Sequence, residues 1–261
     1  MNNSFQNNLT TIDLKGKGLF SKDEVNVSIN SADNENDIVF VVNNEKISAH
    51  VKNIINTARN TVLGKNDQTI CLVEHFLSCC SVLGINNIEV TTNKNELIFD
   101  DGSALHWYRA LKEFSQKIKL KYFLSDTLFI KKGDKIISCI PSDSFKVSYF
   151  MDYNNPLLKN LWVSWSAGDN IERLLRSRTF AKKEENEFFG VAGRILSMTE
   201  DGFDIPLYEP LEPPLHKILD IIGDLRLSGI NPLEIAMHVI SFKGGHDVNV
   251  ELAKEINQVF C

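Results

Sequence analysis

Apolar and polar residues alternate along the first fifty residues in the manner of β-strands. The stretches VNVSI (25–29) and DIVFVV (37–42) combine β-branched residues with flanking clusters of Asn, Asp and Gly, which commonly bound strands. The polar stretch NSADNEND (30–37) joins them and predicts a loop. We therefore predict that residues 9–51 consist mainly of strands.

The pattern then changes to helical spacing. Apolar residues of TICLVEHFLSCCSVLGI (69–85) recur with the period of a helix, and Gly84 predicts its end. NNIEVTTNKNELIF (86–99) returns to strand spacing on both sides of a central polar turn. SALHWYRALKEFSQKI (103–118) predicts a second helix, with Ser103 as a candidate N-cap.

The second half of the chain repeats this order. Strands are predicted at 127–131, 135–140, 145–151, 160–165 and within AMHVISF (236–242). Helices are predicted at 168–176, 214–227 and 249–259. The helices VEHFLSCCSVLGI and LHKILDIIGDLRLSGI also echo each other, with an early histidine and a late Gly-Ile. We therefore predict an α+β fold of two similar domains, each a β-sheet packed on helices, over residues 1–123 and 124–261.

Composition narrows the class of protein. The chain has 261 residues, of which 43% are hydrophobic and 24% charged, as in ordinary soluble globular proteins. Its formal net charge of -6 argues against nucleic acid as the main partner. The five cysteines are odd in number and form no CxxC pair, which argues against a disulfide framework or a cysteine zinc site. With no signal peptide and no apolar run long enough for a membrane span, we expect a reduced, cytoplasmic protein.

Candidate chemistry begins with the helix PPLHKILDIIGDL (213–225). His216, Asp220 and Asp224 recur one turn apart, so they share one face, with Lys217 nearby. One interpretation is an amphipathic helix with a solvated polar face. The other is a pair of metal ligands with a supporting acid, and the pattern of this helix alone leaves both open.

A hydrolytic site follows if two other histidines join this helix. A catalytic zinc ion has three protein ligands, which His75, His216 and Asp220 would supply. Glu74, beside His75, could then take the proton from an activated water. His246 follows a Gly-Gly turn and, as an imidazolium oriented by Asp224, could stabilise the tetrahedral intermediate, while Lys217 could polarise a carbonyl or bind substrate.

Other chemistries fit this sequence less well. It has no Walker A, GxGxxG, GxSxG or HExxH motif. Asp101, Ser103 and His106 lie close together in DDGSALHW, but a capped helix explains the first two. KKGDK (131–135) favours a hairpin turn over a phosphate-binding loop.

The motifs LVEHFLSCCSVLGINNIEV, FDDGSA, SRTF, HKILDIIGDLRLSG and GGHDVNVEL occur here in one order. In this order and setting, the chain resembles the UDP-3-O-acyl-N-acetylglucosamine deacetylase family, zinc enzymes that commit their substrate to lipid A synthesis in Gram-negative bacteria. The resemblance extends from about Gly16 to Leu252. It implies two α+β domains whose helix layers face each other, with the active site between them.

The resemblance also implies roles for individual residues. It places zinc, or iron in the cell, on His75, His216 and Asp220. Glu74 would be the general base, and His246 the cationic histidine with Asp224 behind it. Thr179 would stabilise the oxyanion, while Lys217 and Phe180 would contact a UDP-linked acylated amino sugar. We expect a monomer.

Several positions depart from the family pattern. Phe20 stands where the family usually has histidine, Leu72 where threonine is frequent, and Asn154-Asn155 where histidine often precedes the proline. The segment 181–215 is shorter than in the family and lacks its Gly-Gly-Ser-Leu-Asp-Asn-Ala stretch, in a region that builds part of the acyl-chain passage. The acyl-chain preference should therefore change more than the chemistry. Alternatives are a deacetylase of another N-acetylated amino sugar, or a non-catalytic paralogue that binds a sugar nucleotide or lipid.

Overall fold

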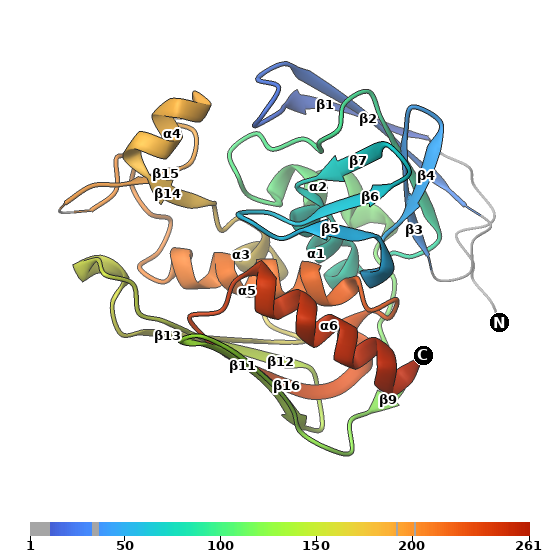
Figure 1. The fold of residues 1–261 in the computed structure, drawn as a ribbon, viewed down its shortest axis with the longest axis vertical. Coiled ribbons are helices and arrows are strands. Elements are labelled where there is room, and N and C mark those ends of the chain that lie inside the picture. Colours follow the sequence, from blue (N-terminus) through green and yellow to red (C-terminus); the bar gives the residue numbers. More distant parts are fainter. Residues whose placement is uncertain (1–10, 33–36, 192, 201) are drawn as a thin grey trace.

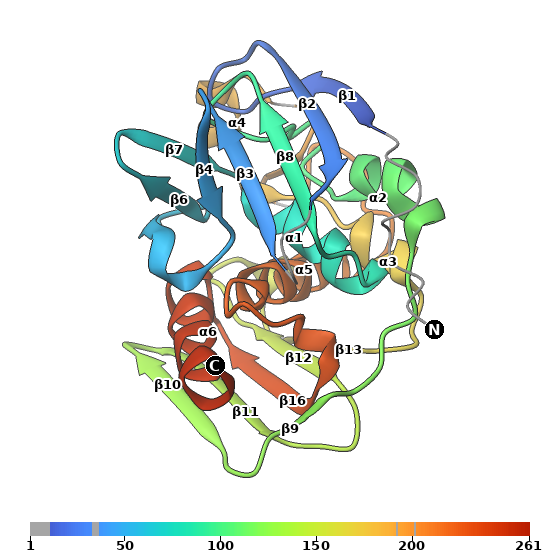
Figure 2. The same cartoon turned by 90° about the vertical axis from the view of Figure 1, so that its right-hand side faces the viewer.

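A computed structural model describes residues 11–32, 37–191, 193–200 and 202–261 of the chain. Two β-sheets lie on opposite sides of the molecule, and helices fill the space between them (Figures 1 and 2). This arrangement confirms the predicted α+β class. The buried side chains of both sheets and of the helices between them form one continuous hydrophobic core.

The two main sheets have the same strand order and the same strand directions. In sequence order, each has a hairpin, a second hairpin, and a later strand that inserts between the two and runs parallel to the third strand. The first sheet is β1 (Ile12–Lys17), β2 (Glu24–Ser31), β8 (Ile88–Thr92), β3 (Ile38–Val42) and β4 (Glu45–Ser48). The second is β10 (Leu128–Lys132), β11 (Lys135–Pro141), β16 (Ile235–Phe242), β12 (Lys146–Met151) and β13 (Leu161–Ser166).

The helices occupy matching places in the two halves. In each half, one long helix immediately precedes the inserted strand and another helix follows it. Apart from α4 (Lys183–Phe189), the helices of the described residues are α1 (Val73–Leu83), α2 (Leu105–Leu111), α3 (Ile171–Leu175), α5 (Glu212–Arg226) and α6 (His246–Phe260). Short 3-10 turns are η2 (Val51–Asn53), η3 (Lys112–Phe114), η4 (Pro156–Leu158) and η5 (Pro232–Glu234). The short strand β9 (Tyr122–Phe123) pairs with β16, although it falls within the predicted first domain, so the boundary at 123/124 stays a prediction.

Each half also carries an added segment outside the shared topology. The first insert is a three-stranded sheet of β5 (Ile54–Asn56), β6 (Val62–Lys65) and β7 (Gln68–Cys71). The second insert is β14 (Phe180–Lys182), α4 (Lys183–Phe189) and β15 (Leu196–Met198), in which β14 and β15 run parallel. In Figure 1 the first insert lies near the centre of the view and the second insert at its upper left. Residues of both inserts line one cavity. Within the described residues, no helix has both the length and the apolar character that crossing a bilayer requires.

Helices α1 and α5 pack against each other where the two halves meet, and Gly223 sets how closely they approach. A Cβ atom at this position of α5 would overlap the backbone carbonyl of Glu74 on α1. Only glycine lets two backbones come this close. The contact places the first turn of α1 directly beside the last turn of α5.

Several local predictions are wrong by a few residues, each for a physical reason. The helix predicted from residue 69 begins at Val73, because Gln68–Cys71 is strand β7 and Leu72 turns the chain with a left-handed φ of 61°. Ala104 instead of Ser103 is the N-cap of α2. The Ser103 hydroxyl still accepts a hydrogen bond from the Leu105 amide, although Ser103 lies one residue before the N-cap. The segment 96–99 forms only an isolated bridge, and α6 begins at His246 instead of 249.

Candidate metal centre and active site

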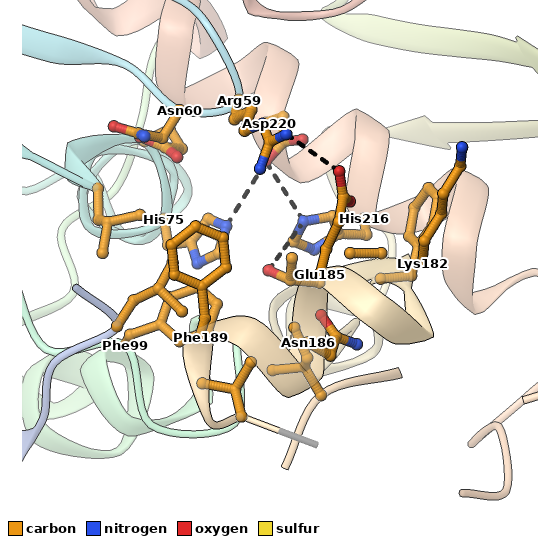
Figure 3. Close-up of a pocket in the computed structure, with 18 of the residues that line it drawn as sticks. Arg59, Asn60, His75, Phe99, Lys182, Glu185, Asn186, Phe189, His216 and Asp220 are labelled. Carbon is orange, nitrogen blue, oxygen red and sulfur yellow. Dashed lines mark hydrogen bonds and ion pairs between the residues drawn. The ribbon is translucent and has the colours of Figure 1, made fainter. Parts of the chain in front are cut away.

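Three buried side chains converge where α1 and α5 meet. His75 comes from the first turn of α1, while His216 and Asp220 lie one turn apart on α5. Nε2 of His75 is 3.6 Å and Nε2 of His216 is 3.5 Å from Oδ1 of Asp220. One ligand atom from each residue lies within 4.8 Å of the others. Figure 3 shows the three side chains close together among the residues that line the cavity. The structure therefore brings together the residues predicted as metal ligands.

The donor set fits a divalent cation. Oδ1 of Asp220 is buried and accepts no hydrogen bond from the described residues, which is costly unless a cation approaches it. Nδ1 of His216 lies 3.1 Å from the carbonyl oxygen of Ser177, which leaves Nε2 as the free ligand atom. Burial lowers the pKa of His216 to about 3, so the ring is neutral and able to bind metal. Oδ2 of Asp220 accepts a hydrogen bond of 2.7 Å from Lys217.

Glu74 lies beside His75 and faces the same cavity. Its Oε2 atom accepts a hydrogen bond of 3.2 Å from the backbone amide of Thr61. Burial raises the pKa of Glu74, which makes this carboxylate a stronger proton acceptor than one in water. The left-handed turn at Leu72 ends β7 and begins α1, and it delivers Glu74 and His75 to the cavity in the first helical turn.

His246 and Asp224 form a buried pair. Nδ1 of His246 is 2.8 Å from Oδ2 of Asp224, which also accepts a hydrogen bond of 2.9 Å from Asn249. Burial by itself would lower the pKa of His246, but the carboxylates of Asp224 and Asp220 outweigh it and raise that pKa to about 9. The ring is therefore an imidazolium at neutral pH and can donate from its cavity-facing side.

The polar face of α5 is therefore not solvated. His216, Asp220 and Asp224 are all buried, and each has a partner on another element or a place in the metal group. The interpretation of this helix as an amphipathic helix with a solvated polar face is wrong, because the helix has a packed neighbour on both sides.

Thr179, Phe180 and Lys217 line the same cavity. The Thr179 hydroxyl donates to the carbonyl of Gly102 at 2.8 Å and lies 3.3 Å from Nε2 of His216. The Phe180 ring packs edge-on to His216, and Nζ of Lys217 lies 5.5 Å from the centre of that ring.

Two residues beside the site were not predicted from the sequence. Thr61 donates a hydrogen bond of 2.6 Å to Oδ1 of Asp224, from which it is separated by 163 positions. Arg178 forms a buried ion pair of 2.7 Å with Glu212, at the start of α5, and thereby anchors the chain just before Thr179. Arg178 lies in the SRTF motif, directly before the predicted Thr179 and Phe180, whereas Thr61 lies in none of the family motifs.

The cavity around these groups has a volume of about 340 Å³. Much of its wall is apolar and comes from both halves of the chain, including Leu19, Leu72, Phe99, Phe189, Val191 and Ile195. Phe20 packs edge-on against Phe189, with ring centres 5.6 Å apart. Arg59 reaches across to Glu185 of α4 in an ion pair of 3.1 Å (Figure 3). The cavity thus combines a polar, metal-binding region with an apolar surface.

Comparisons with known proteins agree on one family. The family model described as LpxC, UDP-3-O-acyl N-acetylglycosamine deacetylase, matches residues 9–258. A protein of Aquifex aeolicus is 29% identical over 94% of this chain and 90% of its own length. A protein of Syntrophus aciditrophicus is 29% identical over 92% of this chain and 81% of its own length. A protein of Trichormus variabilis is 28% identical over 80% of this chain and 81% of its own length. All three are named UDP-3-O-acyl-N-acetylglucosamine deacetylase.

Proposed function

Because the chain belongs to the family of UDP-3-O-acyl N-acetylglycosamine deacetylases, we propose that it removes acetate from UDP-3-O-acyl-N-acetylglucosamine with the help of a bound divalent metal. This is the committed step of lipid A biosynthesis. The observation that carries the proposal is the unpaired, buried Oδ1 of Asp220 between two imidazoles, in the cavity that Glu74 and His246 also line. A cytoplasmic location and a monomeric state stay predictions.

His75, His216 and Asp220 would hold the ion, and zinc is the expected metal. When bound, zinc supplies Lewis acidity, which lowers the pKa of a water molecule from 15.7 to about 7 and polarises a carbonyl. Two imidazoles and one carboxylate also suit iron(II). The metal identity therefore requires measurement.

The residues around the ion would divide the proton transfers between them. Glu74, with its raised pKa, accepts the proton of the water that attacks the acetamide carbonyl. His246, held as an imidazolium by Asp224, stabilises the developing negative charge and donates a proton to the leaving amine. The C–N bond breaks, and acetate and the free amino sugar are the products.

Three other residues would act on the substrate. Thr179 would turn its hydroxyl from Gly102 toward the oxyanion, and Lys217 would present its cation to the polar part of the sugar. Phe180 packs on His216, and its ring would form one wall of the sugar-binding region. The apolar wall would receive the acyl chain. A non-catalytic binding role is less well supported, because such a protein has no need for both Glu74 and His246 in one cavity.

The decisive experiment combines metal analysis with a substrate assay. Protein purified without chelator should contain close to one zinc or iron ion per chain, and a His216→Ala variant should contain much less. The metal-loaded protein should release acetate from UDP-3-O-acyl-N-acetylglucosamine. A protein that binds no metal after supplementation would refute the mechanism. Acetate release from a different N-acetylated sugar alone would support the divergent substrate.

A further inference from the structure

Thr61 makes contacts that no role described so far explains. Its side chain is fully buried, at the end of the loop that leads into β6 of the first insert. Its hydroxyl lies 2.6 Å from Oδ1 of Asp224 and 3.5 Å from Nδ1 of His246. Its backbone amide donates to Oε2 of Glu74 at 3.2 Å. One residue therefore touches both the proposed general base and the pair that forms the proposed acid.

The direction of these hydrogen bonds follows from the groups involved. An ionised carboxylate only accepts, so the single hydroxyl hydrogen of Thr61 points at Oδ1 of Asp224. Oδ2 of Asp224 is then shared by His246 and Asn249. With donors on both of its oxygens, the carboxylate cannot rotate without breaking a buried hydrogen bond. The His246 ring is consequently held with Nε2 at 3.9 Å from Oδ2 of Asp220.

The local backbone is shaped to aim Thr61 inward. Arg59 has a left-handed φ of 72°, which is unfavourable for a residue other than glycine. Such strain is retained where the surrounding structure requires it. It turns the chain so that Asn60 and Thr61 are both buried, while the Arg59 side chain reaches across the cavity to Glu185.

We infer that Thr61 is a positioning residue, which fixes the Asp224–His246 pair and Glu74 relative to each other. The amide positions the base on α1, and the hydroxyl positions the acid pair on α5 and α6. Thr61 bonds to the base and to the acid pair, but among the described residues it belongs neither to the cavity wall nor to the metal group. This inference rests on the proposed function for the roles of Glu74 and His246, although the hydrogen bonds themselves do not.

The test compares Thr61→Val with Thr61→Ser in the metal-loaded protein. Valine keeps the shape of threonine and removes the donor, whereas serine keeps the donor and removes a methyl group. Loss of a hydrogen bond to a charged active-site group lowers activity by roughly 10- to 100-fold. We expect Thr61→Val to lose kcat in this range with KM within about twofold and unchanged metal content. Thr61→Ser should recover most of the rate.

A second comparison separates positioning from general stability. In a His246→Gln background the acid is already absent, so Thr61→Val should cause little further loss, because residues that act as a unit are not additive. If the hydroxyl only stabilised the fold, the same factor would persist in both backgrounds. That persistence, equal rates for wild type and Thr61→Val, or a Thr61→Ser variant as slow as Thr61→Val would each overturn the inference.

A readout that needs no turnover keeps the two proposals distinguishable. In an NMR spectrum of histidine-labelled protein, the Nδ1 proton of His246 is assigned by its absence in His246→Gln. It should be protected in wild type and Thr61→Ser, and should exchange faster in Thr61→Val. Protection unchanged in Thr61→Val would contradict positioning, whether or not the wild type releases acetate. If Thr61→Val does not fold, Thr61→Ala removes the hydroxyl without adding bulk, and the same outcomes apply.

Discussion

The two inserts lie against the same cavity but contribute different kinds of contact. The first insert sends buried polar groups inward, and Thr61 bonds directly to Glu74 and Asp224. The second insert contributes mainly apolar wall, such as Phe189 and Val191, and its helix α4 leaves Phe188 75% exposed. Its links to the first half include the Arg59–Glu185 ion pair, the hydrogen bond from Lys22 to the carbonyl of Phe188, and the Phe20–Phe189 contact.

This difference separates chemistry from substrate preference. Changes near the first insert should alter the rate of the chemical step, because they disturb hydrogen bonds to proton-transferring groups. Changes in the second insert should alter which acyl chain binds, because they reshape an apolar surface. The family pattern fails in the second insert and holds in the motifs that carry the metal group, in agreement with this division.

The largest effect is expected from Glu74→Gln. Removal of a general base typically costs about 10²- to 10⁴-fold in rate. The variant should still bind one metal ion, because Glu74 is not among the ligand atoms that converge on Asp220. Steady-state kinetics of acetate release, with metal analysis of the same sample, tests both points. Unchanged turnover would remove Glu74 from the mechanism and with it one of the two contacts through which the first insert acts on the chemistry.

A pH effect of about 3 kcal/mol is expected for the stability of metal-free protein. The pKa of His246 is raised from 6.5 to about 9 on folding. The folded state therefore holds this proton more tightly, and the stabilisation is fully present below pH 6.5 and lost as pH rises through about 9. Chemical unfolding of chelator-treated protein from pH 6 to pH 10 measures it. His246→Gln should remove the alkaline loss, and Glu185→Gln in the second insert should leave it intact.

Phe189→Ala should raise KM by about tenfold for a long acyl chain and leave kcat nearly unchanged. The half-buried ring contributes apolar contact area to the wall, and its loss removes on the order of 1 kcal/mol of binding. A series of substrates with shorter acyl chains should show a smaller effect. Phe188→Ala, on the same helix but mostly exposed, is the matched control. A lower kcat for Phe189→Ala, with kcat of Phe188→Ala unchanged, would contradict the statement that the second insert affects substrate binding and not the chemical step.

The smallest effect is expected from breaking the ion pair between the inserts. The Arg59 and Glu185 side chains are 65% and 38% exposed, and such pairs contribute about 0–1 kcal/mol. Glu185→Gln should therefore change kcat/KM by less than about fivefold, and moderate salt should reduce the difference further. A loss as large as that of Phe189→Ala would show that the two inserts act as one closed unit.

The sequence predicted the core of this site because its residues lie in short motifs with helical spacing. His216, Asp220 and Asp224 recur one turn apart, and Glu74-His75 begins an apolar helix, so residue type and period carry the signal. What the spacing of α5 did not decide was whether its polar face met water or a second helix. That answer depends on a contact with α1, which no local pattern encodes.

The missed features are tertiary in origin. Thr61 meets Asp224 only because the first insert folds back over α5, and the short strands of that insert are interrupted by Gly, Lys, Asn and Asp, which resemble a loop. The sequence prediction joined strand β7 to the helix that follows it, because Ile70 continues the helical spacing of the apolar residues of α1. The second insert was shorter than the family pattern, so neither its spacing nor the resemblance described it.

The contact between Gly223 and the carbonyl of Glu74 sets the distance between α1 and α5, and this distance determines the geometry of the site. His75 lies on α1, whereas His216 and Asp220 lie on α5. The distance between these two helices therefore sets the distances between the ligand atoms of the metal group. A single methyl group at Gly223 would act as a wedge, spreading the ligand atoms and the base together while leaving every functional side chain present. Such a variant would keep every functional side chain but lose the distances between them that metal binding and proton transfer require.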